Sequence, residues 1–273
     1  MSEKITIIQP KGRFQFIDWK EIWEYRELFW TFVKRDVSVR YKQTFIGGLW
    51  AILQPFITMV VFSFFFGTIM NVASGGVPYP IFSYSGLILW MYFTSAISTA
   101  SGSLIGSASL ITKVYFPRII IPLAATMSGL VDYLISSLLL VFLLIYFQVV
   151  PSIFIFLIPM LAVLTWFLAS GMGLWLSAIN VKYRDVKYVV PFLIQLGLFF
   201  TPVIYPISIA PGFRNILLLN PMTGLIETHR SLILGLENFS FIPLLISIFV
   251  TGLIFISGAF YFKSVEKYFT DII

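Results

Sequence analysis

The 273-residue chain contains no cysteine, a single histidine, His229, and few charged residues, which make up only 11% of its length. The absence of cysteine excludes disulfides, thiolate metal ligands and cysteine nucleophiles. With one histidine, a metal site that depends on imidazole ligands is not expected. The chain also lacks the G-x-x-x-x-G-K-[ST] loop that cradles nucleotide phosphates, so ATP-driven work would need a separate hydrolytic subunit.

Charge is missing altogether between Lys42 and Lys113, and sixteen of the eighteen Lys and Arg residues fall into four short blocks. The whole sequence is 59% hydrophobic and 18% aromatic. One water-soluble core cannot bury that much apolar surface, and the uncharged runs reach the roughly 20 residues that a helix needs to cross a bilayer. No run alternates apolar and polar residues as the strands of a membrane barrel do. The sequence therefore predicts an all-α polytopic membrane protein.

Six segments fit membrane-spanning helices, and the basic blocks lie on one side of them. The predicted spans are 49–70, 81–103, 121–147, 153–179, 189–207 and 241–262. With this threading only Arg214 and Arg230 are external among the basic residues, so we expect both termini in the cytoplasm. The basic pI of about 9.4 is explained by these cytoplasmic loops, and nucleic acid is not an expected partner. We expect a single transmembrane domain, 1–273, divided into a cytoplasmic arm with an interfacial helix, 1–48, a six-span bundle, 49–262, and a cytoplasmic tail, 263–273.

Two segments outside the spans have the composition of membrane-associated helices. Trp23, Trp30 and Val33 fall on one helical stripe, which predicts an N-terminal amphipathic helix in the membrane interface. A soluble helix packed on a partner is the alternative. The segment Pro202–Ser240 combines four prolines with an apolar run, Ile216–Ile226, that is too short to cross. We expect short external re-entrant helices here, at the rim of a translocation path, because broken backbone at membrane depth requires protein or a water-filled cavity beside it.

Asp132 lies inside the third predicted span, where a carboxylate costs roughly 2.5 to 3.5 kcal/mol on insertion scales. No basic residue in any predicted span is available to pair with it. It is either a proton relay or part of a polar path, or a protonated or hydrogen-bonded acid that contacts Ser128, Ser136 or a neighbouring helix. A membrane glycosyl- or acyltransferase, which would use Asp132, Glu227 or His229 at its reaction centre, is an alternative to transport.

Clusters at the ends of the spans resemble those of the ATP-binding-cassette permeases that export O-antigen, capsular polysaccharide or teichoic acid. At the first span they are Arg35-Asp36, Arg40-Tyr41-Lys42, Ile46-Gly47-Gly48-Leu49-Trp50 and Gln54-Pro55. Further along the chain they are Lys113-Val114-Tyr115-Phe116-Pro117-Arg118, Asn180-Val181-Lys182-Tyr183-Arg184-Asp185, Gln195 with Thr201-Pro202-Val203-Ile204-Tyr205, and Asn220-Pro221. The resemblance depends on their order and spacing, which extend through the whole chain.

This resemblance implies a transporter half and not an enzyme. Two copies would form a homodimer in the bacterial inner membrane, in contact with membrane lipid, and enclose a channel. Two copies of a partner ATPase would bind the ATP and Mg, and this chain would hold no cofactor or metal. The substrate implied is a polysaccharide linked to undecaprenyl diphosphate or a similar lipid. A cassette permease for a drug or a small lipid is a further alternative.

Four groups of candidate residues follow from the resemblance and from the chemistry of the substrate. The expected ATPase-coupling loops contain Lys113, Tyr115, Phe116, Arg118, Lys182, Arg184, Asp185 and Lys187. Guanidinium groups bind phosphate oxygens well, and the candidates for the lipid diphosphate are Arg35, Arg40, Arg118 and Arg184. Alternatively, these arginines fix the membrane topology, pair with acids such as Asp36 and Asp185, or bind lipid headgroups. Sugar rings stack on aromatic side chains, and the channel-lining candidates are Phe62, Phe65, Phe66, Tyr92, Phe93, Phe199, Phe200 and Tyr205, although any of them could face lipid or pack between helices. The expected external gate contains Arg214, Asn220, Glu227, His229 and Arg230.

Overall fold

The computed structural model describes residues 19–42, 46–209, 211–236 and 241–269, and every regular element in these ranges is a helix. The α-helices are α1 (Trp19–Glu24), α2 (Arg26–Tyr41), α3 (Trp50–Phe62), α4 (Tyr79–Gly106), α5 (Ala108–Ile111), α6 (Ile120–Tyr146), α7 (Ile158–Lys182), α8 (Val186–Phe199), α9 (Arg214–Leu219), α10 (Pro221–Leu234) and α11 (Phe241–Val265). Short 3-10 turns are Gly47–Leu49, Ile153–Leu157, Ile207–Ile209, Pro211–Phe213 and Glu266–Tyr268, and a π-helical segment, Ser63–Ile69, extends α3. The outer part of the predicted arm, 1–18, and the end of the predicted tail, 270–273, lie outside the described residues.

Five helices of the described part are long and apolar enough to cross a membrane. They are Gly47–Ile69, Tyr79–Gly106, Ile120–Tyr146, Ile153–Lys182 and Phe241–Tyr268. The prediction of a polytopic all-helical membrane protein is therefore confirmed for these residues, whereas the count of six spans stays a prediction.

The fifth predicted span, 189–207, is the exception. Helix α8 has only 14 residues, about 21 Å at a rise of about 1.5 Å per residue. It ends at Phe199 and turns before Pro202, because proline supplies no backbone N–H and disfavours helical conformation in the residue before it. The apolar residues beyond Pro202 therefore made the predicted fifth span longer than the helix.

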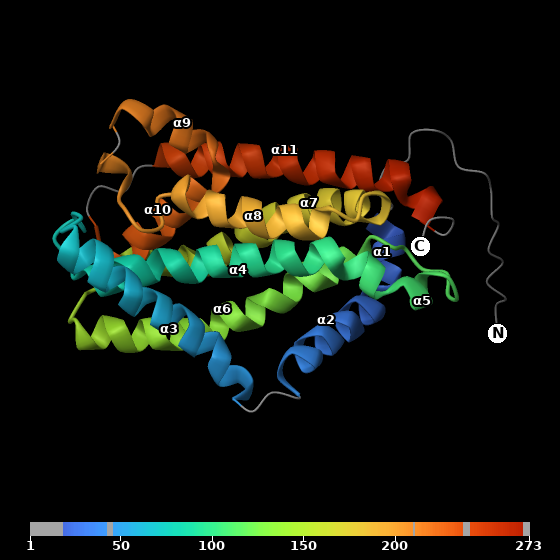
Figure 1. Cartoon of the computed structure of the whole chain (residues 1–273), viewed down its shortest axis with the longest axis horizontal. Helices are drawn as coiled ribbons and strands as arrows, with labels where there is room; N and C mark the ends of the chain where they lie inside the picture. The colour runs from blue at the N-terminus through green and yellow to red at the C-terminus, as the bar shows by residue number, and fades with distance from the viewer. Residues whose placement is uncertain (1–18, 43–45, 210, 237–240, 270–273) are drawn as a thin grey trace.

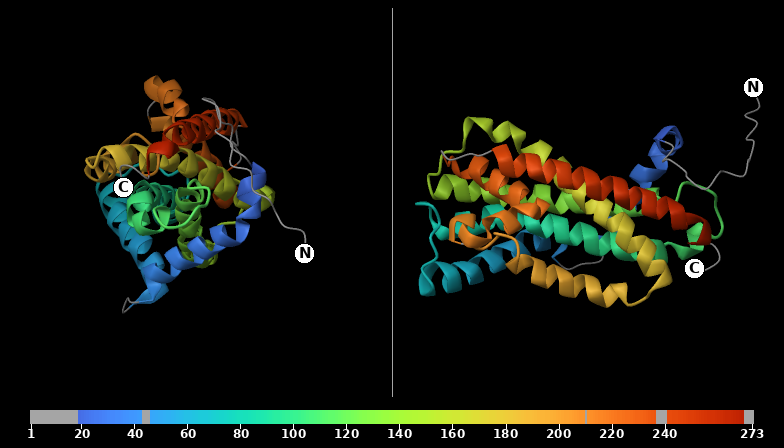
Figure 2. Two further views of the ribbon diagram at one scale, coloured as in Figure 1. Left: turned by 90° about the vertical axis from the view of Figure 1, so that its right-hand side faces the viewer. Right: turned by 90° about the horizontal axis from the view of Figure 1, so that it is seen from above.

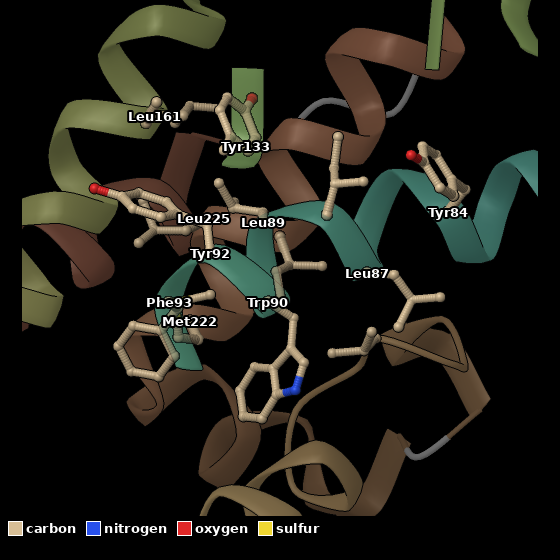
Figure 3. Close-up of a cluster of buried hydrophobic side chains, with 14 of the residues drawn as sticks. Tyr84, Leu87, Leu89, Trp90, Tyr92, Phe93, Tyr133, Leu161, Met222 and Leu225 are labelled. Carbon is tan, nitrogen blue, oxygen red and sulfur yellow. The ribbon is translucent and has the colours of Figure 1, made fainter. Parts of the chain in front are cut away.

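Helix α4 forms the centre of the bundle. It packs against α3, α6, α7, α8 and α10, and 78% of its most apolar stretch is buried, compared with 11% for the first span. Figure 3 shows its side chains, including Leu89, Trp90 and Phe93, directed toward several surrounding helices. Seen along the bundle, α2 and α3 lie on one side of α4 and α11 lies on the opposite side (Figure 2).

The predicted N-terminal helix is present but is broken at Tyr25 into α1 and α2 (Figure 1). The predicted stripe is only partly buried. Phe32 and Val33 are buried in a core cluster, whereas Trp23 and Trp30 are exposed. Because Trp30 and Val33 both lie on α2, the break at Tyr25 does not account for this difference. The exposed tryptophans leave the interfacial prediction open.

Helix α10 begins and ends at residues that suit those positions. The side chain of Asn220 accepts a hydrogen bond from the backbone N–H of Met222 at 3.1 Å, and Pro221 occupies the first turn, where a missing N–H costs nothing. Gly235 ends the helix with a φ of 63°, a left-handed conformation that glycine adopts freely. The Asn220-Pro221 pair therefore fixes where this buried helix starts.

Candidate functional site

A cavity of about 750 Å³ opens among the end of α2, the turn at Ile46 and Gly47, and helices α3, α4, α6 and α8. Its wall on α4 consists of Ile88, Met91, Tyr92, Thr94, Ser95, Ser98 and Thr99. The remaining lining residues are Arg40, Tyr41, Ile46, Gly47, Trp50, Ala51, Gln54, Pro55, Asp132, Tyr133, Ser136, Pro191 and Ile194. Small hydroxyl side chains and aromatic rings thus share one cavity with one cation and one carboxylate.

The cation and the carboxylate form an ion pair. A guanidinium nitrogen of Arg40, at the end of α2, contacts Oδ2 of Asp132 on α6, 92 residues away in sequence. The partner thus comes from the helix that precedes the first predicted span and not from another span, which agrees with the alternative of an acid that contacts a neighbouring helix. The hydroxyl of Ser136 does not bond the carboxylate; its one hydrogen is shared between the carbonyl oxygens of Ala51, at 2.7 Å, and of Asp132 itself, at 2.8 Å.

The predicted channel aromatics separate into different environments, and of the eight only Tyr92 lines the cavity among the described residues. Phe93 is buried beside Trp90, and Phe62 packs edge-on against Phe66. Phe65, Phe199 and Phe200 are exposed in the single chain, and the half-buried Tyr205 donates to the carbonyl of Phe199. Their roles in a channel stay predictions.

Sequence reasoning missed most of the cavity wall. Trp50 and Gln54 are one helical turn apart on α3, and Ser95 and Thr99 are one turn apart on α4. Tyr133, which neighbours Asp132, lies with its ring centroid 5.9 Å from that of Tyr92, and Figure 3 shows the two rings on adjacent helices. A search for polar residues at helical spacing within the spans would have found the α4 stripe.

Arg230, predicted at the external gate, is almost wholly buried, with 1% exposure. It donates from Nη2 to the carbonyl of Val203 at 2.7 Å and from Nη1 to the carbonyl of Pro202 at 3.1 Å. Nη1 also lies 2.9 Å from Oε1 of Glu227, and the guanidinium lies 3.9 Å from the centroid of the Phe82 ring. Arg230 therefore satisfies the irregular backbone after α8 and ties it to the start of α4.

His229 is also buried and has two partners. Its Nδ1 lies 2.8 Å from the carbonyl oxygen of Ser85, and its Nε2 lies 2.9 Å from the hydroxyl of Tyr133. Because a carbonyl can only accept, Nδ1 carries the proton and Nε2 accepts from Tyr133. Burial lowers the pKa of His229 to about 4, so the ring is neutral at physiological pH.

The remaining predicted gate residues are Asn220 and Arg214. Asn220 bonds to the hydroxyl of Thr201 at 2.9 Å, which links the turn after α8 to the start of α10. Arg214 lies exposed on α9. Whether this region gates a path stays a prediction.

The two predicted coupling loops lie at the end of the bundle where α4 and α7 finish, shown at the right of Figure 1. Phe116 is buried and meets Phe32 of α2 edge-on, with ring centroids 5.8 Å apart. Arg118 donates to the carbonyl of Glu266 at 2.6 Å. The other predicted coupling residues are exposed: Lys113, Tyr115, Lys182, Arg184, Asp185 and Lys187. The first loop is thus packed against α2 and tied to the end of α11.

Among the arginines predicted for the diphosphate, Arg35 is exposed and bonds to the neighbouring Asp36, with Nη2 and Oδ1 2.8 Å apart. Arg184 is exposed in the second loop. Arg40 is the one of the four that lines the cavity.

A multi-pass helical bundle with basic loops at one end is an arrangement suited to transport, and comparison with known families decides which kind. The sequence model of the ABC-2 type transporter family matches residues 27–234. The chain belongs to the ABC-2 type transporter family. The match runs from α2 to the end of α10, so it includes the cavity with Arg40 and the buried site of Arg230. The family is that of ABC transporter permeases, which implies partnership with an ATPase.

Several relatives of this ABC-2 transporter are named for polysaccharide export. The O-antigen export system permease protein RfbA of Klebsiella pneumoniae is 29% identical over 251 residues, which cover 90% of this chain and 95% of that protein. The protein of the same name from Myxococcus xanthus is 29% identical over 217 residues, covering 78% and 82%. The polysialic acid transport protein KpsM of Escherichia coli is 24% identical over 206 residues, covering 73% and 78%.

Proposed function

We propose that this chain is the membrane subunit of an ATP-driven exporter of lipid-linked polysaccharide. The substrate is a polymer such as O-antigen on an undecaprenyl diphosphate-type lipid, which moves from the cytoplasm to the outer face of the inner membrane. The observation that carries this proposal is the likeness to an O-antigen export permease over 95% of that protein's length. A likeness of that extent leaves no large part of the relative without a counterpart here.

In the proposed transporter two copies of the chain face each other and enclose the path. The first span supports this arrangement, because only 11% of it is buried within one chain, and its exposed apolar residues need lipid or a second copy as cover. Helix α8 and the turn that follows it act as the remaining crossing. Both termini are cytoplasmic, since the basic loops mark that side.

Two ATPase subunits bind ATP and Mg and dock at the basic end of the bundle. The exposed residues Lys113, Tyr115, Lys182 and Lys187 supply contacts there. Because Phe116 packs on α2 and Arg118 is tied to the end of α11, a push on the first loop reaches both helices. Rigid-body motion of packed helices is a common means of such transmission.

Export in a strain that lacks the chromosomal copy of this chain tests the proposal. We expect polymer to accumulate in the cytoplasm of that strain, and to return to the cell surface only when the chain and its ATPase are supplied together. A drug or small-lipid permease would leave polymer export unchanged on deletion. Export by the chain without any ATPase would contradict the proposal.

A further inference from the structure

The cavity contains one cation whose hydrogen-bonding capacity is only partly used. A guanidinium group offers five N–H donors. Arg40 uses one nitrogen for Oδ2 of Asp132, and its Nη2 lies 3.5 Å from the hydroxyls of both Thr99 and Ser128, at the outer limit for a hydrogen bond. The Arg40 side chain is 26% exposed and lines the cavity, so donors remain available there.

Its partner is also only partly satisfied. Within the described residues, Oδ1 of Asp132 has no hydrogen-bond partner, and neither has the hydroxyl of Tyr92, which is 2% exposed. Buried polar atoms are rarely left without a partner, and each exception calls for an explanation such as a bound water or ion. Both side chains line the cavity beside its one cation, and although the two atoms themselves are buried, a polar ligand there would complete their bonds once the side chains turn toward it.

The chemistry of the wall selects the ligand. Phosphate oxygens match the planar fork of arginine, which binds them in pairs. The Tyr92 hydroxyl and the Gln54 amide offer bonds to sugar hydroxyls, and the ring of Trp50 offers an aromatic face. A volume of about 750 Å³ lies within the ordinary range of ligand pockets.

We propose that Arg40 binds the diphosphate of the lipid-linked substrate, with the first sugar against Tyr92, and that Asp132 holds Arg40 in the empty state as an internal competitor for that anion. This inference rests on the proposed function and names the part of the substrate that the cavity takes. The carboxylate keeps Arg40 paired while the cavity is empty. When the diphosphate takes its place, Asp132 stays partly hydrated, because its side chain is 22% exposed.

Binding of farnesyl diphosphate, a soluble prenyl diphosphate, tests the competition. The full-length chain is assembled with its ATPase in phosphatidylcholine nanodiscs and titrated by calorimetry. We expect Arg40→Gln to weaken binding about 10-fold or more, since one charge-assisted hydrogen bond is worth about 1.5 to 3 kcal/mol and each 1.4 kcal/mol is tenfold. Asp132→Asn should tighten binding about 5-fold, because it removes the competitor.

The direction of the Asp132→Asn effect decides the proposal. An ion pair that only supports the fold predicts weaker or unchanged binding, and either result overturns the competition. Arg26→Gln on the same helix, where the arginine is exposed and bonds the carbonyl of Trp23, should bind like wild type. If Arg40→Gln fails to fold, the double variant Arg40→Gln/Asp132→Asn replaces the charged pair by two amides and should fold without binding the diphosphate.

Two further measurements identify the source of the anion. Inorganic diphosphate should compete weakly, and nanodiscs with one-fifth phosphatidylglycerol should leave binding of farnesyl diphosphate unchanged. Equal competition by phosphatidylglycerol would make this an ordinary headgroup site and overturn the assignment. Polymer export by the wild-type chain together with its ATPase separates the two proposals. If wild type exports polymer and the double variant Arg40→Gln/Asp132→Asn binds and exports as well as wild type, only this inference fails. If wild type exports no polymer, the proposed function fails.

Discussion

Arg230 is buried and Arg40 is half-buried, and each pairs with a carboxylate, but their surroundings differ. Arg230 donates to the carbonyls of Phe82, Pro202 and Val203 as well as to Glu227. Arg40 has no short contact besides Asp132 among the described residues, and it borders a cavity. One guanidinium is held by backbone, whereas the other is held by a side chain that can move.

The difference indicates what each arginine does. Backbone carbonyls cannot leave without unfolding a segment, so a cation that binds three of them is part of the fold. Gly86 supports this arrangement, because a Cβ at that position would lie 2.6 Å from Nη2 of Arg230 and 3.2 Å from the carbonyl oxygen of Val203. A carboxylate side chain can be displaced by another anion, which suits a binding site.

The largest effect is expected from Arg230→Gln. Removal of this cation leaves Glu227 and several carbonyls without partners in a buried region, and breaking a buried pair costs about 3 to 5 kcal/mol. The fraction of monodisperse protein after detergent extraction, and its apparent melting temperature, should fall sharply. Arg214→Gln on the exposed helix α9 should leave both values unchanged. A fully stable Arg230→Gln variant would end the distinction between the two arginines.

A second test of the packed region is Gly224→Ala, where α10 crosses α11. A Cβ on Gly224 would overlap the carbonyl oxygen of Pro243 and the hydroxyl of Ser247. Overpacking of this kind costs about 1 to 3 kcal/mol. In Gly102→Ala the new methyl would meet no heavy atom within 4 Å among the described residues, apart from the backbone of its own helix, so its melting temperature should be unchanged or higher. Equal melting temperatures for the two variants would contradict the close crossing.

The sequence predicted the parts of the fold that depend on composition alone. The lengths of the apolar runs located the first four spans and the last, since lipid imposes a minimum of roughly 20 residues on each. The prediction treated the apolar run Ile216–Ile226 as one piece, although Asn220-Pro221 divides it between α9 and α10. The fifth span was predicted at the wrong length because one proline barely lowers the mean hydropathy of an apolar segment. The same proline, Pro202, ends a helix because it lacks a backbone N–H.

Tertiary pairing could not be predicted in the same way. Arg40 and Asp132 are 92 residues apart, and Arg230 bonds a carbonyl 148 residues before it. No local pattern specifies such partners, because they depend on how the helices are arranged around α4. A single sequence therefore indicated that Asp132 needed a partner, but it identified neither Arg40 as that partner nor the carbonyls that Arg230 binds.

The smallest effects separate Tyr133 from Tyr92, which lie on facing helices between the two arginine regions. Tyr133→Phe removes the donor to Nε2 of His229 and leaves a buried ring nitrogen without a partner, which costs about 1 to 3 kcal/mol. Tyr92→Phe removes a hydroxyl that has no partner in the described structure, so its melting temperature should stay at the wild-type value or rise slightly. Export should show the opposite order, with Tyr92→Phe reducing mainly the rate per folded transporter and Tyr133→Phe reducing mainly the amount of folded protein. A loss of stability in Tyr92→Phe with an unchanged rate per transporter would assign that hydroxyl to the fold and remove it from the substrate cavity.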